Sequence, residues 1–295
     1  MSWQFDPGHT HIGFTGRHLM VSTVRGAFDQ FSGTVEFDEQ DIVRSKVDIQ
    51  IEAASVNTRN AQRDEHLRST DFLDVERYPY LLRVWNYVPD INRDSHGTER
   101  YRLFNAARQQ ALEACGRPLT GKVPAASALG AAAGSPLVAY FLAARTAPAF
   151  VENPRQVSAY HYPRRYGAHS PVFSRATLQR QNGSLMLFIS GTASIVGHRS
   201  IHVGDTAAQT RETLTNIAAL LEEANRVERA ACFSLGSLAC KVYVRRPADL
   251  ATIRAELSKA LEPAAKVIYL QADICRQDLL VEIEATGMCP LKADA

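Results

Sequence analysis

The sequence predicts an α+β protein in which an antiparallel β segment, a partial barrel, precedes a larger α/β domain. Residues 1–83 alternate apolar and polar side chains with the period of two that is typical of strands. Residues 84–295 alternate strand-like runs with long amphipathic stretches, which predicts helices on one face of a mixed sheet. We therefore expect two domains, residues 1–83 and residues 84–295.

The first expected domain contains three strand-like segments and one helix. The segments HIGFTGRHL, GAFDQFSGTVEFD and SKVDIQIEAASV alternate apolar and polar residues, which indicates half-buried strands. Gly26, Gly33 and the acidic segment DEQD favour turns between them. The charged stretch NAQRDEHLRSTDFL follows, and its short apolar spacing predicts a helix.

The second expected domain begins with an extended segment that becomes a helix from about Thr98. The stretch AASALGAAAGSP is expected to be a turn region, and PLVAYFLAA a strand. Further strands are expected at LMLFISGTASIV, SLACKVYVRR, KVIYLQADIC and LLVEIEA. Two amphipathic helices, TAAQTRETLTNIAALLEEANRVE and DLATIRAELSKAL, lie between these strands in the sequence.

The charge of the chain is unevenly distributed. Residues 1–84 hold 9 of the 33 Lys and Arg and 13 of the 31 Asp and Glu, a net charge of −4, so residues 85–295 carry +6. A mildly basic second part suits an anionic substrate. It lacks the Lys/Arg runs of a nucleic-acid binder, so no nucleic-acid partner is expected.

Cysteine usage and the apolar runs indicate a protein of the cytoplasm. The five cysteines are odd in number and no two have CxxC spacing, so neither a zinc site nor a disulfide framework is expected. The N-terminus does not have the pattern of a signal peptide, and no apolar run approaches the ~20 residues of a membrane span. We expect a cytoplasmic protein with reduced thiols and no membrane partner.

Arginine, tyrosine and small hydroxyl residues are concentrated in residues 152–205. Arginine binds carboxylates through its planar fork, and tyrosine adds a directional hydroxyl on a rigid ring. No phosphate-cradling glycine loop accompanies them, so the stretch predicts a pocket for a small molecule with several carboxylates. The stretch from Ser190 to Ser194, in which Ser190, Thr192 and Ser194 form one row, is expected to form a wall of small residues in this pocket.

The closing strands are expected to have one apolar and one polar face. In KVIYLQADIC, period-two alternation places Ile268 and Leu270 on the apolar face, and Tyr269 and Cys275 on the opposite one. The polar faces are either simply solvated or they line a pocket. Their Ser, Thr, Cys, Tyr, Arg and Glu residues, in place of a Lys/Glu mixture, favour the pocket.

Glu282 is the candidate acid on this polar side. It lies between apolar neighbours in LLVEIEA, where burial would raise the pKa of its carboxyl. Such a group stays protonated near neutral pH and can act as a general acid. Glu284 shares the same face and competes for the role, and two like charges on one face would further raise one of their pKa values.

Several separated motifs lie within about residues 82–288: ERYRLFNAAR, ENPRQVSAYHYP, SPVFSRATL, FISGTASIVGH and LQADICRQDLLVEIEA. Together they resemble the chorismatase family, which includes 3-hydroxybenzoate synthases and chorismate-hydrolysing enzymes. The resemblance implies a fold similar to RidA-type and chorismate-mutase-like proteins, and a homotrimer. It also implies chorismate as the substrate and a reaction that needs no metal and no organic cofactor.

The resemblance also assigns roles to individual residues of this chain. Glu282 in LLVEIEA matches the catalytic acid, in agreement with the position of Glu282 on the strand face. Cys275 in ADICR matches a product-determining cysteine of members that release an aromatic product. Four further residues match substrate-binding positions: Tyr101, Arg108, Tyr162 and Arg175.

The reaction implied is removal of the enolpyruvyl group of chorismate as pyruvate. Glu282 would protonate the methylene carbon of the enol ether, and an oxygen nucleophile would capture the oxocarbenium ion. Cys275 favours 3-hydroxybenzoate as the product, with 4-hydroxybenzoate as a second one. The alternative is hydrolysis, which leaves a dihydroxycyclohexadiene carboxylate.

Two segments of the N-terminal part carry a second resemblance: DPGHTHIGFTGRHLMVSTVRGAFDQFSGTVEFD and ASVNTRNAQRDEHLRSTDFLDVERYP. They resemble the first half of YceI-like polyisoprenoid-binding β-barrels. A half-barrel cannot close, so it would leave unpaired strand edges. The second hypothesis for this chain is therefore an isoprenoid-binding protein or an inactive fusion.

Two other constellations are weighed against these interpretations. His9 and His11 alternate on a strand, but a metal site would need further converging ligands, so no metal is expected. A nucleophilic triad can be written from Ser194, His198 and Asp205. No GxSxG elbow accompanies these residues, so a triad is not expected.

Overall fold

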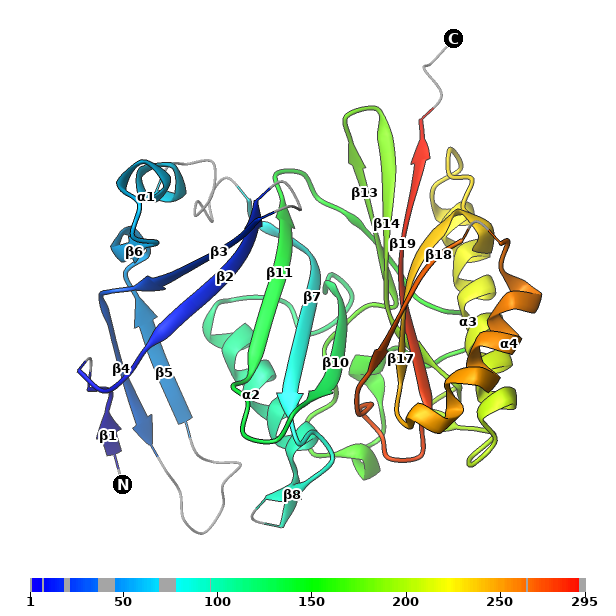
Figure 1. Ribbon diagram of the computed structural model, residues 1–295, viewed down its shortest axis with the longest axis horizontal. Coiled ribbons are helices and arrows are strands. Elements are labelled where there is room, and N and C mark those ends of the chain that lie inside the picture. Colours follow the sequence, from blue (N-terminus) through cyan, green and yellow to red (C-terminus); the bar gives the residue numbers. More distant parts are fainter. Residues whose placement is uncertain are drawn as a thin grey trace. The chain divides into compact units, whose positions relative to one another are not determined.

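The computed structural model describes residues 2–6, 8–18, 22–36, 46–68, 78–95, 97–263 and 265–291. The chain divides into two compact units, Met1–Pro79 and Tyr80–Ala295 (Figure 1). Strand β7, Tyr80–Pro89, runs across the boundary expected after residue 83, so the second unit begins where this strand begins.

The first unit is built from short antiparallel strands, as the alternation in the sequence predicts. One three-stranded sheet has the order β1-β4-β5 and the other has the order β2-β3-β6. The strands are β1 Ser2–Gln4, β2 Ile12–His18, β3 Ser22–Phe28, β4 Phe31–Glu36, β5 Lys46–Ile51 and β6 Val56–Asn57. Helix α1, Ala61–Arg68, is tied to β6 because Arg68 Nη2 donates to the Val56 carbonyl at 2.9 Å.

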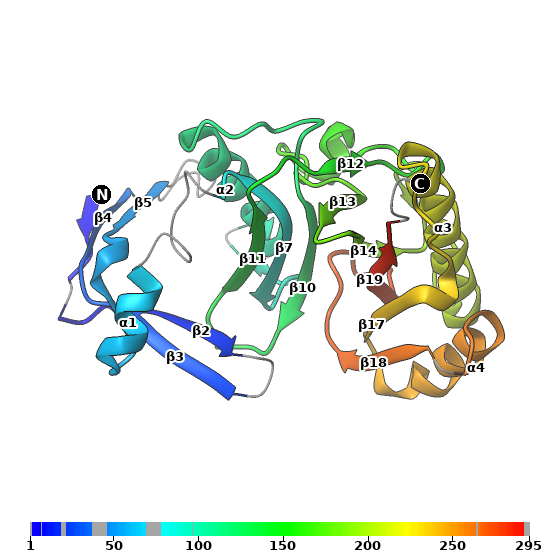
Figure 2. The same ribbon diagram turned by 90° about the horizontal axis from the view of Figure 1, so that it is seen from above.

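The second unit contains a six-stranded mixed sheet with two helices on one face (Figure 2). Its order is β12-β13-β14-β19-β17-β18, and only the pair β17–β18 among these is parallel. The strands are β12 Ala149–Val151, β13 Ala176–Gln181, β14 Ser184–Ala193, β17 Leu238–Val244, β18 Lys266–Gln271 and β19 Val281–Pro290. The helices are α3, Thr206–Val227, and α4, Leu250–Ala260. The predicted fold class is confirmed.

A three-stranded sheet, β10-β7-β11, completes the second unit together with helix α2, Arg100–Ala114. Strand β10, Ala125–Ala131, runs parallel to β7, and β11, Val138–Ala144, runs antiparallel to it. Two small hairpins are β8 Asp94–Ser95 with β9 Thr98–Glu99, and β15 Ile195–Val196 with β16 Arg199–Ser200. No helix among the described residues is long and apolar enough to cross a bilayer.

The core lies between the helices and the six-stranded sheet. Asp205 caps α3 by accepting a hydrogen bond from the Ala208 N–H at 2.9 Å. Buried residues at helical spacing, such as Leu214 and Leu220, pack from α3 against the sheet. Val281 and Ile283 of β19 belong to the same cluster, so the helix-facing side predicted for this strand is confirmed.

The predicted faces of β18 are wrong. Val242 of β17 lies opposite Tyr269 in the parallel pair and belongs to the core, so Tyr269 points toward the helices. Ile268 and Leu270 are instead 53% and 42% exposed on the other side. The strand ends at Gln271, and the buried Ile274 lies beyond its end. The burial of Ile274 therefore does not indicate which residues of β18 face the core.

The stretch AASALGA is a strand and not the predicted turn. Its small side chains allow close packing: a Cβ on Gly130 would lie 2.5 Å from Asp273 Cβ. Strand β10 also lies against the six-stranded sheet, because the Ala126 N–H donates to Ser190 Oγ at 2.9 Å. The three-stranded sheet thereby contacts the face of the larger sheet that the helices leave free.

The core packing gives a testable expectation for α3. Leu220 is fully buried, so Leu220→Ala should lower the free energy of unfolding by about 2–5 kcal/mol through lost burial and a cavity. Leu137→Ala removes the same atoms at an exposed position and should change the free energy of unfolding by less than about 0.5 kcal/mol. Urea unfolding followed by circular dichroism measures both, and equal losses would contradict this description of the core.

Candidate active site

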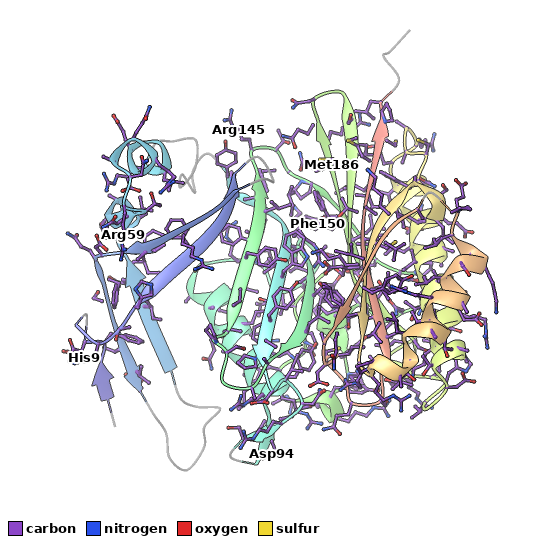
Figure 3. All side chains as sticks on the ribbon, in the orientation of Figure 1. His9, Arg59, Asp94, Arg145, Phe150 and Met186 are labelled. Atoms are coloured by element: carbon purple, nitrogen blue, oxygen red, sulfur yellow. The ribbon has the colours of Figure 1, made fainter. Side chains whose placement is uncertain are left out.

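A cavity of about 550 Å³ opens on the sheet face opposite the helices α3 and α4. It is lined by side chains from distant parts of the sequence, among them Tyr101, Tyr162, Arg175, Gly191, Cys275 and Glu282. Asp94, which lies at the β8 hairpin in Figure 3, is also part of its wall. A volume of this size is typical of small-molecule sites.

A smaller chamber of about 40 Å³ adjoins the larger cavity. Both cavities share Tyr101, Cys275 and Glu282, and Arg108 lines only the smaller one. The structure thus brings all six residues singled out in the sequence to one place, with Glu282 where the two cavities meet.

The Glu282 carboxyl is buried beside the cavity and largely unpaired. Its side chain is 3% exposed and lies opposite Ala193 and Tyr243 across the neighbouring strands. Burial, reinforced by the negative charge of Glu284, raises the pKa of Glu282 to about 8. This carboxyl contacts the Cys275 thiol, whose Sγ lies 4.0 Å from Glu282 Oε2. Glu282 is therefore protonated near neutral pH.

Glu284 is held as a carboxylate, in contrast to Glu282. Burial alone would raise the pKa of Glu284, but the charges of Arg83 and Lys241 outweigh it and hold this pKa below its ordinary value. Its partners are Arg83 Nη2 at 2.7 Å, Ser127 Oγ at 2.8 Å, Trp85 Nε1 at 2.9 Å and Lys241 Nζ at 2.9 Å. Of the two carboxyls on this face, Glu282 is the one that has a proton to donate.

A register shift in β14 makes room for the Glu282 carboxyl. The pairing of β14 with β19 is interrupted between Ile189 and Thr192. Gly191 lies within this irregularity, and a Cβ there would approach Glu282 Oε1 to 1.9 Å. The small-residue wall of the cavity consists of Gly191, Ala193 and Ile195.

The row Ser190, Thr192 and Ser194, expected to form that wall, points elsewhere. Ser190 Oγ accepts from the Ala126 N–H at 2.9 Å and donates to the Ser174 carbonyl. Thr192 Oγ1 donates to the Ser190 carbonyl at 2.9 Å. The hydroxyls of this row therefore hold the backbone together and do not line the cavity.

Arg175 and Tyr162 form a paired unit in the cavity wall. Arg175 is 3% exposed, and its Nη2 donates to Tyr162 Oη at 2.8 Å and to the Val157 carbonyl at 2.9 Å. Its Nε is shielded from solvent and has no hydrogen-bond partner among the described residues. This guanidinium has a fixed orientation and a donor left over for a ligand.

Arg108 and Tyr101 lie two helical turns apart on α2 and both face the chambers. Burial lowers the pKa of Arg108 to about 10, so the group is still a cation at neutral pH. Its Nε is shielded and unpaired within the described part of the chain. Burial raises the pKa of Tyr101, which keeps its hydroxyl protonated as a donor.

Sequence reasoning missed Arg276, the next residue after Cys275 in the motif ADICR. Its guanidinium carbon lies 5.1 Å from the Tyr162 ring centre and 4.2 Å from the Tyr166 ring centre, and the side chain lines the larger cavity. Its Nη1 donates to the His198 carbonyl at 3.0 Å. The position beside Cys275 was the available signal, because an arginine next to a cavity residue adds positive charge there.

The residues of the alternative triad are not brought together as a catalytic set. Ser194 Oγ donates to the Ile201 carbonyl at 2.9 Å, and Asp205 is the cap of α3. His198 Nδ1 lies 2.8 Å from Arg165 Nη2. Among the described residues, no group of three His, Cys, Asp or Glu side chains is arranged to hold a metal ion.

Comparisons of the sequence and of the structure with known proteins find several relatives of this chain. A 3-hydroxybenzoate synthase from Streptomyces hygroscopicus is 39% identical over 77% of this chain and 69% of its own length. The chain belongs to the chorismatase family. A chorismatase from Streptomyces rapamycinicus is 43% identical over 72% of this chain and 66% of its own length. The crystal structure of a chorismatase superposes with a TM-score of 0.69 at 35% identity, covering 92% of this chain and 78% of that one.

The N-terminal part has a separate relationship. Residues 3–87 match the family model of the YceI-like domain. The match extends into β7, which belongs to the second unit. The chain therefore combines a YceI-like segment with a chorismatase-family unit, and it spans about two thirds of the length of the two Streptomyces relatives.

The raised pKa of Glu282 gives an expected pH dependence of stability. The folded value of about 8 lies above the ordinary 4.5, so stability is fully present below about pH 4.5 and falls as the pH rises toward 8. This pH-dependent loss of stability should be a few kcal/mol, and it should be absent from Glu282→Gln, whose side chain does not titrate. The melting temperature of Glu282→Gln relative to the wild type should therefore increase between about pH 5 and about pH 9.

Scanning calorimetry at the two pH values measures this difference. Glu222→Gln, at an exposed position on α3, is the matched control and should follow the wild type at both. A constant difference between Glu282→Gln and the wild type would show that the Glu282 carboxyl titrates normally.

Proposed function

We propose that this protein cleaves chorismate to pyruvate and an aromatic hydroxybenzoate, with Glu282 as the acid. The observation that carries the proposal is a protonated, buried carboxyl at the junction of cavities that also contain unpaired arginine donors. Such a pairing suits a substrate that is anionic and that reacts by accepting a proton. The names of the two Streptomyces relatives, 3-hydroxybenzoate synthase and chorismatase, agree with this substrate.

Arg108 and Arg175 would bind the two carboxylates of chorismate, and the hydroxyls of Tyr101 and Tyr162 would add hydrogen bonds. Each arginine has an Nε that is shielded from solvent and has no partner in the described part of the chain, which is costly unless a ligand satisfies it. Guanidinium groups bind carboxylates through paired donors. Arg276 adds a third cation to the wall of the larger cavity.

Glu282 would protonate the methylene carbon of the enolpyruvyl ether. The ether carbon then becomes an oxocarbenium ion, and the Glu282 carboxylate left behind balances its charge. An oxygen nucleophile captures the cation and pyruvate departs. When the ring aromatises, the atoms of chorismate divide between pyruvate and the hydroxybenzoate; when water is the nucleophile, hydrolysis adds one water and leaves the dihydroxycyclohexadiene carboxylate.

Cys275 would decide between these outcomes in favour of 3-hydroxybenzoate, with 4-hydroxybenzoate as a minor product. Burial raises the pKa of its thiol to about 12, so it stays uncharged beside Glu282. The sulfur fills space within 4.0 Å of the acid, where a water molecule would otherwise have room. A smaller residue there would favour capture by water and thus the hydrolytic product.

The trimer and a lipid-binding role for the first unit remain predictions from resemblance. The described residues of the first unit surround a cavity of about 370 Å³ lined by Phe5, Phe31 and neighbouring polar residues. The catalytic proposal rests on the second unit alone, because every residue that it uses lies between Tyr80 and Ala295.

The purified protein should release pyruvate from chorismate, and Glu282→Gln should not. A positioned acid contributes roughly 100- to 10,000-fold, so turnover should fall by that factor while chorismate binding is kept. The wild-type rate should also decline above about pH 8, where Glu282 loses its proton. A coupled lactate dehydrogenase assay measures turnover, and calorimetric titration measures binding.

Glu222→Gln, on the exposed face of α3, is the control for this substitution and should keep full activity. The proposal fails if folded wild-type protein releases no pyruvate. The assignment of the acid fails separately if Glu282→Gln is fully active.

Cys275→Ala should shift the products from hydroxybenzoate toward the dihydroxycyclohexadiene carboxylate, because a water molecule gains room beside Glu282. Liquid chromatography of the chorismate reaction gives the ratio. Cys115→Ala, at an exposed position after α2, should leave the ratio unchanged. An unchanged ratio in Cys275→Ala would remove the role of this thiol.

A further inference from the structure

We propose that Glu284 is a fixed negative charge that keeps the neighbouring Glu282 carboxyl protonated, and that Lys241 sets how strongly this charge acts. The inference deepens the proposed function, since it rests on Glu282 as the proton donor. Glu284 would not touch the substrate. It would act as a positioning residue whose charge selects the protonation state of the acid.

The two carboxyls are coupled by the geometry of β19. Glu282 and Glu284 are two residues apart in one strand, so both side chains leave the same face. Both are almost completely buried, at 3% and 4% exposure. Charges in such surroundings are weakly screened, so only one of the two carboxyls can ionise near neutral pH without a large cost.

The surroundings decide that Glu284 is the ionised member of the pair. Four donors from three other strands converge on it: Arg83 and Trp85 of β7, Ser127 of β10 and Lys241 of β17. Lys241 lies directly opposite Glu284 in the β17–β19 register. Glu282 lies opposite the neutral Tyr243 and receives no comparable set of donors from the described residues.

Glu284 also neutralises a cation that would otherwise ionise the acid. Arg83 is completely buried and its guanidinium faces both carboxyls. If Glu284 were neutral, this buried cation would stabilise a carboxylate at Glu282 instead. The hydroxyl of Ser127 accepts from Arg83 Nη2 and donates to Glu284, which keeps the cation on the Glu284 side.

The other groups around Glu282 do not supply an equivalent negative charge. Cations on several elements favour its ionised form: Arg83, Arg175 and Arg245, with Arg108 and Arg276 in the cavity walls. Tyr101, Tyr243 and Cys275 are neutral, since burial raises the pKa of each. Asp94, Glu99 and Asp278 line the larger cavity, but each is more exposed than Glu284.

Lys241 provides a way to change the coupling in the opposite direction. The Lys241 side chain is 33% exposed and lines a further cavity of about 360 Å³, so its removal leaves space that water can fill. Without Lys241, Glu284 would keep Arg83 as its partner while less positive charge offsets its effect on Glu282. Replacing Glu284 and replacing Lys241 should therefore shift the pKa of Glu282 in opposite directions.

The test compares Glu284→Gln and Lys241→Met with the wild type. The C=O infrared band of the protonated carboxyl, identified by its loss in Glu282→Gln, reports the pKa of Glu282 without any turnover. This pKa should fall by about one to two units in Glu284→Gln and rise in Lys241→Met. Lys266→Met removes an exposed lysine from the wall of the cavity that Lys241 also lines, and it should leave the pKa of Glu282 unchanged.

The pH dependence of pyruvate release from chorismate provides the second readout. The alkaline limb should move to lower pH in Glu284→Gln and to higher pH in Lys241→Met, so that Glu284→Gln regains activity when the pH is lowered. A merely structural role of Glu284 would lower activity equally at every pH.

The inference is overturned if both substitutions shift the pKa of Glu282 in the same direction, or if Glu284→Gln leaves it unchanged. Should Glu284→Gln fail to fold, Lys241→Met decides alone: a rise in the pKa supports the inference and no rise overturns it. If the wild type releases no pyruvate, the proposed function fails, while the infrared titration still measures the coupling.

Discussion

The site depends on one constraint: of two carboxyl groups on one buried strand, one is ionised and the other is protonated. Glu282 and Glu284 leave the same face of β19, and low dielectric surroundings make a second negative charge there expensive. Cationic partners stabilise the charge on Glu284, whereas Glu282 is buried without such an ion pair among the described residues and keeps its proton. Burial thus raises the pKa of Glu282, and the negative charge of Glu284, held by an ion pair outside the cavity wall, raises it further.

This constraint connects the architecture to the chemistry. The donors to Glu284 come from β7, β10 and β17, so the three-stranded sheet is joined to the six-stranded sheet at the carboxylate beside the acid. Loss of Glu284 would leave Arg83 as an unpaired buried charge, which costs several kcal/mol in proteins. The same cluster therefore covers the polar face of the larger sheet and adjusts the protonation of Glu282. A change that weakens the packing of the two sheets is expected to disturb the acid as well.

The sequence predicts the side chains whose positions follow from local periodicity. Glu282 could be found because alternation along β19 places Val281 and Ile283 against the helices and the glutamate away from them. Alternation fails where the backbone is irregular: the shift between Ile189 and Thr192 turns Gly191, and not the serines, toward the cavity. The domain boundary, the strand β10 and the partners of Glu284 depend on contacts between distant segments, which periodicity does not contain.

A site that binds an anionic substrate and also keeps an acid protonated has conflicting electrostatic requirements. Cations such as Arg108 and Arg175 attract carboxylates, but each also favours the ionised form of a nearby acid. Glu284 opposes that effect before any ligand arrives, because it carries its charge in the free protein. A bound dicarboxylate would add negative charge in the cavity and pair with the arginines, so substrate binding and protonation of Glu282 would support each other. Substrate binding would therefore raise the pKa of Glu282 further above the value of about 8 in the free protein.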